Sequence, residues 1–334
     1  MGQAVRAFVA RTTAAGTQGQ VEDVAPETLP AGEVTIAVEY SSLNFKDALA
    51  ATGQNKVAAS YPHIPGIDAA GTVAASSDPA FAVGERVLVT GYELGAPRWG
   101  GWATQVRVPS AWVVRIPAAL STVDAMAIGT AGFTAGLAIE ALQRNGTLPA
   151  SGPVVVTGST GGVGCLAVDM FAAAGYHVVA VTGKADQHDW LTRLGAAEIL
   201  PREAVSLADT PNPRPLLPAK WAGALDNVGG ATLEALVRAT QIGGNVALCG
   251  LVGGTDYRGT VLPFILRGVG LLGITSSGTP MAVRAPLWQR LATDLRPRHL
   301  AEVTRTVPLG GLIPEVERML AGKAFGRVVV DVRA

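Results

Sequence analysis

Short apolar blocks alternate with segments of helical periodicity from about residue 151 to the end of the chain. Each block has the length of a buried strand, and the segments between them repeat apolar residues every three or four positions. This alternation predicts a parallel, doubly wound α/β sheet. The expected strands are Val154–Thr157, His177–Val181, Ala197–Leu200, Gly223–Asn227, Gly244–Leu251 and Leu271–Thr275.

Residues 1 to about 120 have a different pattern, in which short β-rich runs recur between turn residues. The runs are Val5–Ala10, Glu33–Tyr40, Gly71–Ala75, Arg86–Thr90, Ala103–Val108 and Trp112–Ile116. Their spacing predicts a compact, barrel-like β domain. The pattern becomes helical at Ser121. A final strand, helix and strand (303–307, 312–321 and 327–332) indicate a return to the first domain.

A glycine-rich turn lies between the first two strands of the predicted sheet. Gly158, Gly161, Gly162 and Gly164 follow Val154–Thr157, and a helical pattern starts directly after them. A strand, glycine turn and helix in this order direct backbone N–H groups and a helix N-terminus at one point, which suits a pyrophosphate. The first glycine of the strict G-x-G-x-x-G motif is replaced by Ser159. The alternative is an α/β turn that binds no ligand.

The residues after the second predicted strand indicate which dinucleotide binds. NAD-binding units place an Asp or Glu there, where it holds the ribose 2′-OH. This chain has Thr182, Gly183 and Lys184 instead. A lysine attracts a 2′-phosphate that a carboxylate would repel, so the sequence predicts NADPH as the cofactor. The alternative for Lys184 is a solvated loop lysine.

The length and composition indicate about two domains that can bury a large core. The chain has 334 residues, of which 49% are hydrophobic, and its formal net charge is zero, which disfavours a nucleic-acid or membrane-surface partner. We find no uninterrupted apolar run long enough to span a bilayer and no signal peptide. The two cysteines, Cys165 and Cys249, are expected in the core, and a cytoplasmic location is expected because no disulfide framework is present.

Several kinds of site are disfavoured by the residues present. The four histidines are not spaced as metal ligands with each other or with a cysteine, so no metal is expected. No tyrosine has a lysine four residues later, as a short-chain dehydrogenase requires, and no Walker A lysine follows the glycine turn. The prolines at 211, 213, 215 and 218 exclude a regular helix there and predict an extended surface segment.

A polar cluster at residues 41–47 carries the candidate chemistry of the first domain. It follows a predicted strand and precedes a predicted helix over Lys46–Ala51. Asn44 offers an amide donor, Lys46 a cation, and Asp47 could orient either. Without a metal, such donors would have to stabilise a carbonyl oxygen that becomes an enolate. The alternative is that Asn44 only caps the helix.

The order of motifs along the chain resembles the medium-chain dehydrogenases/reductases. The motifs are SSLNFKDALAATG, PGIDAAGTV, GERVLVTG, RWGGWATQVRV, AIGTAGFTA, VVVTGSTGGVG, WAGALDNVGG, CGLVGG, LPFILRGVGLLGI and GRVVVDV. They are most similar to the zinc-free quinone-oxidoreductase group and its acrylyl-CoA reductase branch. Where zinc-using relatives carry a His ligand, this chain has Ile67. The resemblance implies a GroES-like catalytic domain (1–120 and 300–334), a Rossmann NADPH-binding domain (121–299), and NADPH between them.

The resemblance also implies the site residues. Asn44 and Asp47 are the expected catalytic residues. The expected cofactor-binding residues are Phe45, Thr130, Ser159, Thr160, Gly161, Gly162, Val163, Thr182, Gly183, Lys184, Arg202, Leu251, Ile265 and Ser276. Of these, Leu251 and Ile265 could equally be core residues. The family commonly has arginine at 184, and its Asn-Tyr-Lys-Asp motif has Phe45 in place of tyrosine here, so the aromatic wall is kept without its hydroxyl.

The implied activity is the NADPH-dependent reduction of an activated C=C bond, with acryloyl-CoA converted to propanoyl-CoA. Two alternatives stay open: an NADPH:quinone or general enone reductase, and a non-catalytic NADPH-binding protein. The implied partners are a small-molecule substrate, and no nucleic acid or membrane. The apolar segment Val261–Ser276 resembles the strand through which this family forms homodimers; a buried core segment is the alternative.

Overall fold

The computed structural model describes residues 4–14 and 16–334, which form two compact units. The first unit comprises Met1–Ala131, Ser276–Ala292 and Leu300–Ala334, and the second comprises Gly132–Thr275 and Thr293–His299. The domain boundaries expected from the sequence, at 120/121 and 299/300, stay a prediction.

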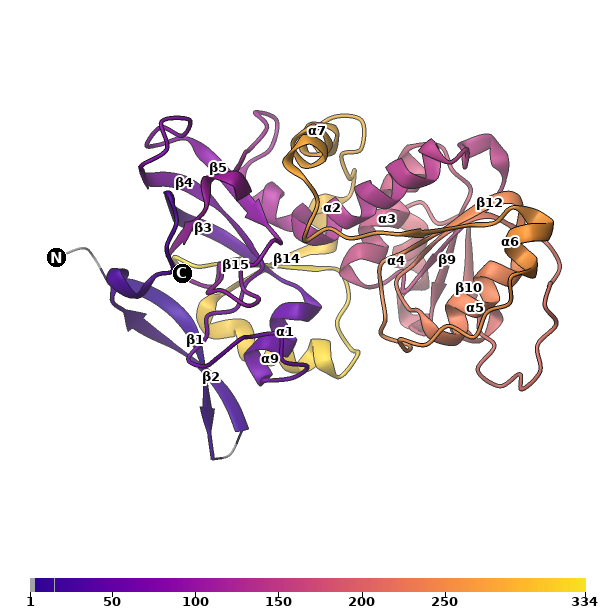
Figure 1. Ribbon diagram of the computed structural model, residues 1–334, viewed down its shortest axis with the longest axis horizontal. Helices are drawn as coiled ribbons and strands as arrows, with labels where there is room; N and C mark the ends of the chain where they lie inside the picture. Colours follow the sequence, from indigo (N-terminus) through magenta and orange to yellow (C-terminus); the bar gives the residue numbers. More distant parts are fainter. Residues whose placement is uncertain (1–3, 15) are drawn as a thin grey trace. The chain divides into compact units, whose positions relative to one another are not determined.

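The first unit is built on a β sheet with strand order β14-β15-β3-β4-β5-β7, in which β6 also pairs with β3. A separate hairpin, β1–β2, projects from this unit in Figure 1. The strands of the first unit are β1 (Val5–Thr13), β2 (Gly16–Val24), β3 (Val34–Leu43), β4 (Asp68–Ser76), β5 (Arg86–Thr90), β6 (Gln105–Val108), β7 (Val114–Arg115), β14 (Thr304–Pro308) and β15 (Arg327–Asp331).

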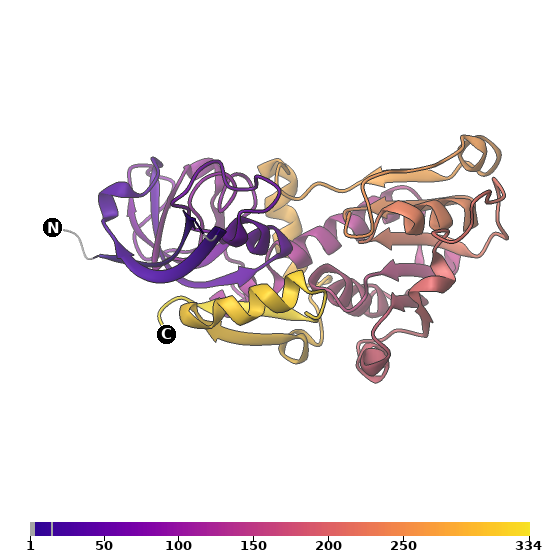
Figure 2. The same cartoon turned by 90° about the horizontal axis from the view of Figure 1, so that it is seen from below.

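The end of the chain, Leu300–Ala334, lies in the first unit. Strand β15 pairs antiparallel with β3, and β14 pairs parallel with β15. Helix α9 (Leu312–Leu320), which connects them, packs against helix α1 (Phe45–Thr52). Figure 2 shows these yellow C-terminal elements within the first unit. The pairing brings Arg327, near the end of the chain, next to Leu43 and Asn44.

The second unit is the predicted doubly wound sheet. All its strands are parallel, in the order β10-β9-β8-β11-β12-β13, and the order reverses between β8 and β11. Each predicted strand is present: β8 has the predicted bounds, and the ends of the others are shifted by one to four residues. The strands are β8 (Val154–Thr157), β9 (Val178–Thr182), β10 (Glu198–Pro201), β11 (Trp221–Asp226), β12 (Thr240–Leu248) and β13 (Gly270–Gly273).

The helices follow from local signals that the sequence carries. Besides α1 and α9 they are α2 (Thr122–Arg144), α3 (Gly162–Ala173), α4 (His188–Arg193), α5 (Gly230–Ala239), α6 (Leu262–Arg267), α7 (Met281–Leu291) and α8 (Leu300–Val303). As predicted, no regular helix forms over the prolines at 211–218. Arg238 on α5 holds this segment instead by donating to the backbone carbonyl of Arg214 (2.8 Å).

Helix α2 differs from the continuous helix that its pattern predicts. The backbone of Gly129 lies at φ 50° and ψ −158°, so the helix is broken there. By length and composition α2 could cross a membrane, and it is the single such helix in the described part of the chain. However, 78% of its most apolar window is buried inside the protein, as in a core helix.

Cys165 is fully buried as expected, whereas Cys249 is only partly buried. Both are free thiols. The expectation that Cys249 is a core residue is therefore wrong, because β12 ends just before it and the chain leaves the sheet.

Candidate functional site

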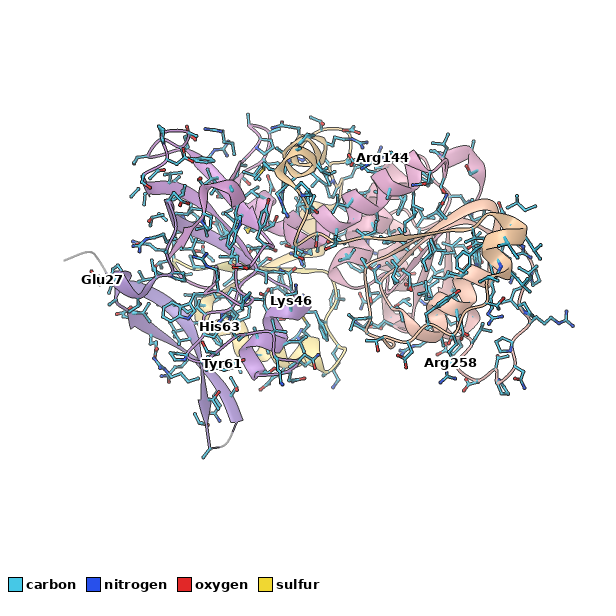
Figure 3. All side chains as sticks on the ribbon, in the orientation of Figure 1. Glu27, Lys46, Tyr61, His63, Arg144 and Arg258 are labelled. Carbon is cyan, nitrogen blue, oxygen red and sulfur yellow. The ribbon has the colours of Figure 1, made fainter. Side chains whose placement is uncertain are left out.

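The polar cluster of the first unit forms where β3 ends and α1 begins. Asn44 is the N-cap of α1, and its backbone N–H donates to Asp47 Oδ2 (2.8 Å). This is the capping arrangement that an Asn followed three residues later by an acidic residue favours. Asp47 is fully buried and Asn44 is half-buried, whereas Phe45 is 41% exposed. Lys46 is exposed on the surface of α1 (Figure 3).

Asp68, at the start of β4, organises this cluster. Its carboxylate is fully buried and accepts hydrogen bonds from Ser42 Oγ (2.5 Å) and Asn44 Nδ2 (2.9 Å). It also accepts from Thr130, through both the backbone N–H (3.0 Å) and the hydroxyl (2.5 Å). A buried carboxylate is tolerated when its oxygens are this well supplied with donors. Asp68 therefore fixes two of the expected site residues, Asn44 and Thr130.

Arg327, the first residue of β15, closes the cluster from the opposite end of the chain. It is 2% exposed and donates to Asn44 Oδ1 (3.2 Å). It also donates to the carbonyls of Ala127 (2.9 Å) and Met126 (3.4 Å), which end the first half of α2. Sequence reasoning missed Arg327 and Asp68 as site residues. The signal available was weak: each is a charged residue within an apolar strand pattern.

Asp68 and Arg327 bind the backbone on the two sides of the break in α2. Asp68 accepts from the Thr130 N–H at the start of the second helical half, and Arg327 binds carbonyls at the end of the first half. A negative charge at a helix N-terminus and a positive charge at a C-terminus are both favourable. A Cβ atom at Gly129 would lie 2.6 Å from Asp68 Oδ2 and 2.9 Å from an Arg327 nitrogen, so only glycine fits between them.

The amide of Asn44 is fully engaged within the cluster. Its Nδ2 atom lies 2.9 Å from Asp68 Oδ2, 3.0 Å from Ser42 Oγ and 3.2 Å from Asp47 Oδ2, and an amide has only two N–H groups. The side chain of Asn44 therefore does more than cap a helix, because it joins strand β3, helix α1 and strand β4. If Asn44 donates to a substrate oxygen, one of these bonds must be given up.

The Asp47 carboxyl is fully buried and ties the loop before β4 to α1. Its Oδ1 atom accepts from the backbone N–H groups of Ile67 (2.8 Å) and Gly66 (3.1 Å). Burial, followed by the nearby Asp68 carboxylate, raises the pKa of Asp47 from 3.8 to about 7, although the N–H groups of Asn44 and Ile67 oppose the shift.

Asp47 is expected to make the stability of the protein pH-dependent. Because its folded-state pKa lies above its unfolded value, the native state binds more protons between about pH 4 and pH 7. The free energy of unfolding should therefore fall as pH rises through this range, by at most about 1.4 kcal/mol per pH unit from this group. Urea unfolding at several pH values would measure it. The Asp47→Asn variant should lack this part of the slope, and equal slopes in the two proteins would contradict the assignment.

The glycine turn of the second unit begins as predicted, with Gly158 in the left-handed region (φ 57°) and Gly161 as the N-cap of α3. A Cβ atom at Gly164 would lie 2.2 Å from the Gly158 carbonyl oxygen, so the helix approaches the turn too closely for any side chain. The backbone N–H groups of Gly162 and Val163 are in the first turn of α3, where such groups have no acceptor within the helix. They are the groups best suited to a phosphate.

Ser159 contributes to this turn internally. Its side chain is fully buried, donates to the Val156 carbonyl (2.6 Å) and accepts from the Val181 N–H (2.8 Å). Its own N–H donates to the Val181 carbonyl (3.2 Å). Thr160 is 5% exposed. Ser159 thus joins β8 to β9, and its expected contact with a pyrophosphate stays a prediction that these hydrogen bonds do not favour.

Lys184, which follows β9, and Arg202, which follows β10, lie close together. The Arg202 guanidinium lies across Gly183, since a Cβ atom there would be 2.0 Å from an Arg202 nitrogen. Burial lowers the pKa of Lys184, Asp186 raises it, and Arg202 lowers it further. Lys184 is half-buried, so it is not the fully solvated lysine of the alternative. Two exposed carboxylates, Asp186 and Glu203, also lie close to these cations.

A pocket of about 470 Å³ lies at the carboxyl ends of β12 and β13. Its wall is made by Gly229, Gly230, Leu233, Leu248, Cys249, Gly250, Leu251, Gly254, Thr255, Asp256, Gly273, Ile274 and Thr275. Leu251 is 57% and Ile265 69% exposed, so the alternative that they are core residues is wrong. Ile265 lies on α6 and Ser276 directly follows the pocket residue Thr275.

A buried carboxylate binds the backbone of Gly229, one of the residues that line this pocket. Asp226, at the end of β11, accepts from the Thr157 hydroxyl (2.6 Å) and from the N–H groups of Val228 and Gly229 (both 3.0 Å). Burial raises the pKa of Asp226. The carboxyl ends of β8 and β11, between which the strand order reverses, are thereby joined. Ligands of doubly wound sheets bind at such a reversal.

Across residues 4–14 and 16–334, no group of three or more His, Cys, Asp or Glu side chains is placed to hold a metal ion. Ile67, where zinc-using relatives have a ligand, is a buried hydrophobic residue next to Asp68.

Comparisons with known proteins match the chain over nearly its whole length. Residues 30–118 match the model for the "Alcohol dehydrogenase GroES-like domain", and residues 162–293 match that for "Zinc-binding dehydrogenase". The acrylyl-CoA reductase AcuI of Ruegeria pomeroyi is 45% identical over 95% of this chain and 96% of its own.

Two solved structures are similarly close. The yhdH oxidoreductase of Salmonella enterica, in complex with NADP, is 43% identical with a TM-score of 0.94, over 98% of this chain and 99% of that one. The Bacillus subtilis protein yhfP, with NAD bound, is 44% identical with a TM-score of 0.95, over 99% of this chain and 100% of that one.

Proposed function

Because the chain belongs to the medium-chain dehydrogenase/reductase family, in the group that contains the acrylyl-CoA reductases, we propose that it reduces the activated C=C bond of acryloyl-CoA to propanoyl-CoA with NADPH. The observation that carries the proposal is the 45% identity to an acrylyl-CoA reductase over 95% of the chain. Both units of the fold match along their length, so the relationship covers the catalytic and the cofactor-binding parts together.

NADPH is the cofactor that the second unit is best suited to hold. The N–H groups of Gly162 and Val163 would bind the pyrophosphate. Lys184 and Arg202, whose guanidinium lies across Gly183, would bind the 2′-phosphate. The pocket beyond β12 and β13 lies on the other side of the strand-order reversal from Lys184, where the nicotinamide half of an extended dinucleotide would reach.

NADPH, when bound, would supply the hydride that adds to the β-carbon of the acyl group. The negative charge that follows would collect on the thioester oxygen, where donors of the first unit have to stabilise it. A proton from water would then add to the α-carbon and complete the propanoyl group. Asn44 and Thr130 are the proposed donors, both oriented by Asp68. Arg327 donates to the side-chain carbonyl of Asn44, which keeps the amide N–H groups directed toward Asp68 and Ser42.

The test is turnover by the purified protein with NADPH, followed as the loss of NADPH absorbance, with acryloyl-CoA and with a quinone as separate substrates. Faster turnover of acryloyl-CoA is expected. Turnover of the quinone alone would identify an NADPH:quinone reductase, and NADPH binding without any turnover would identify a non-catalytic binding protein. Either result would replace the proposed activity.

We also propose that the protein is a cytoplasmic homodimer. Strand β13 is the outer strand of the six-stranded sheet, and Leu271 on it is 37% exposed. Val261, Ile265 and Leu266, in and beside α6, are 60–69% exposed and extend this apolar surface. The outer edge of such a strand, beside exposed apolar side chains, favours pairing with a second copy of the chain. Light scattering should give twice the chain mass.

A further inference from the structure

Arg284 on α7 is a fully buried cation that binds two separate segments of the first unit. One guanidinium nitrogen donates to the carbonyl and the hydroxyl of Thr90, both at 2.8 Å. The other donates to the carbonyls of Ser276 (2.7 Å) and Ser277 (3.3 Å). The planar fork of an arginine side chain thus joins the end of β5 to the segment that follows β13.

The segment Ser276–Thr279 is held by further contacts around Arg284. The guanidinium lies 4.4 Å from the centre of the Tyr92 ring. The Tyr92 N–H donates to the Ser277 carbonyl (2.9 Å), and its hydroxyl donates to the Thr279 carbonyl (3.4 Å). Tyr92 itself stacks on Trp112, with their ring planes 3° apart. The main chain of this segment therefore has one defined position relative to β5.

Through Thr90 the same guanidinium reaches the strand that carries Asp68. Thr90 is directly opposite Asp68 in the register of β4 and β5. Asp68 in turn orients Asn44 and Thr130. A buried cation is costly to place, and neutral packing could hold a surface segment equally well. The use of an arginine here therefore indicates that its function is to fix the position of Ser276 relative to the Asp68 cluster.

We propose that Arg284 is a positioning residue that holds the Ser276–Ser277 main chain next to Thr90. Ser276 then contacts the nicotinamide end of the cofactor, at which Asn44 and Thr130 also act. This inference rests on the proposed function, which assigns Ser276 to the cofactor wall. Arg284 acts through these residues and does not contact the reacting atoms.

The experiment compares two ligands in the wild type and the Arg284→Lys variant. NADPH carries a nicotinamide, whereas 2′-phospho-ADP-ribose has the same adenosine end without it. Lysine keeps the charge but lacks the fork that binds Thr90 and Ser276 together. We expect weaker NADPH binding and a fall in kcat of up to about 100-fold, as for other misplaced reacting groups. The affinity for 2′-phospho-ADP-ribose should be unchanged, since Lys184 and Arg202 hold that end.

A general loss of stability would instead lower the affinities for NADPH and for 2′-phospho-ADP-ribose by the same factor. Arg305→Met is the control for a loss of stability: Arg305 is a partly buried arginine of the first unit, which pairs with Glu315 and binds the Phe325 carbonyl (3.0 Å). It should lower the melting temperature and leave the ratio of the two affinities at the wild-type value. If Arg284→Lys does not fold, Thr90→Val, which removes a single acceptor, should shift the ratio in the same direction by less.

An unchanged ratio in Arg284→Lys, or an equal loss of both affinities, would overturn the inference. Failure of the proposed function has a different signature, because it appears in the wild type as absent turnover of acryloyl-CoA. The affinity ratio still tests Arg284 in that case, provided that NADPH binds.

Discussion

Replacing Asp68 with asparagine is expected to lower kcat for acryloyl-CoA by at least about 100-fold. The carboxylate accepts hydrogen bonds from Ser42, Asn44 and Thr130. An asparagine would turn an N–H₂ group toward these donors or leave several of them without an acceptor. Asn44 and Thr130 would then lose the geometry that directs them toward the substrate. We also expect the free energy of unfolding to fall by about 1–3 kcal/mol, the cost of a buried group left unsatisfied.

Steady-state kinetics and urea unfolding of the same preparation separate the two effects. Asp209→Asn is the matched control, because it makes the same chemical change at an exposed position just before the prolines at 211–218. It should retain wild-type kcat and stability. Wild-type turnover in folded Asp68→Asn would show that the cluster does not orient groups used in the reaction.

Replacing Lys184 with glutamate is expected to weaken NADPH binding by about 100-fold or more and to improve NADH binding. The change puts a negative charge where the 2′-phosphate is proposed to bind, beside Arg202. Two unit charges about 4 Å apart near a protein surface interact by about 4 kcal/mol, so reversing one charge has a large effect even after screening. The glutamate would also suit the ribose 2′-OH of NADH.

Calorimetric titration with both dinucleotides, at low and high salt, measures this preference. Lys323→Glu, at an exposed position after α9, reverses the same charge and should leave both affinities unchanged. The comparison is informative because yhfP, at 44% identity, has a structure with NAD bound. Equal affinity of the wild-type protein for NADPH and NADH would contradict the assignment of Lys184 and Arg202 to a 2′-phosphate.

The features that follow from neighbouring residues could be predicted from the sequence. The strands of the second unit, the glycine turn and the helix after it depend on periodicity and on local steric demands, which act over a few residues. β8 and β5 have the predicted bounds. Strand β2 was missed because most of its residues are polar or glycine and none of them is buried, so it has no apolar alternation to detect.

The candidate site could be predicted only in part. The position of Asn44 before a helix and the cations at 184 and 202 are visible in the sequence. The engagement of the Asn44 amide by three acceptors and the internal use of Ser159 are not. A residue type shows which hydrogen bonds are possible, whereas the folded surroundings decide which of them are already made.

By itself, then, the sequence determined the two kinds of domain, the dinucleotide turn and the family, because each depends on short patterns of residues. Only the tertiary structure decided that Asp68 and Arg327 meet Asn44 at the break in α2, and that Arg284 joins Thr90 to Ser276. The physical reason is that a buried charge is stable only beside its partners. Here those partners come from strands and helices far apart in the chain, which come together only when the sheets form.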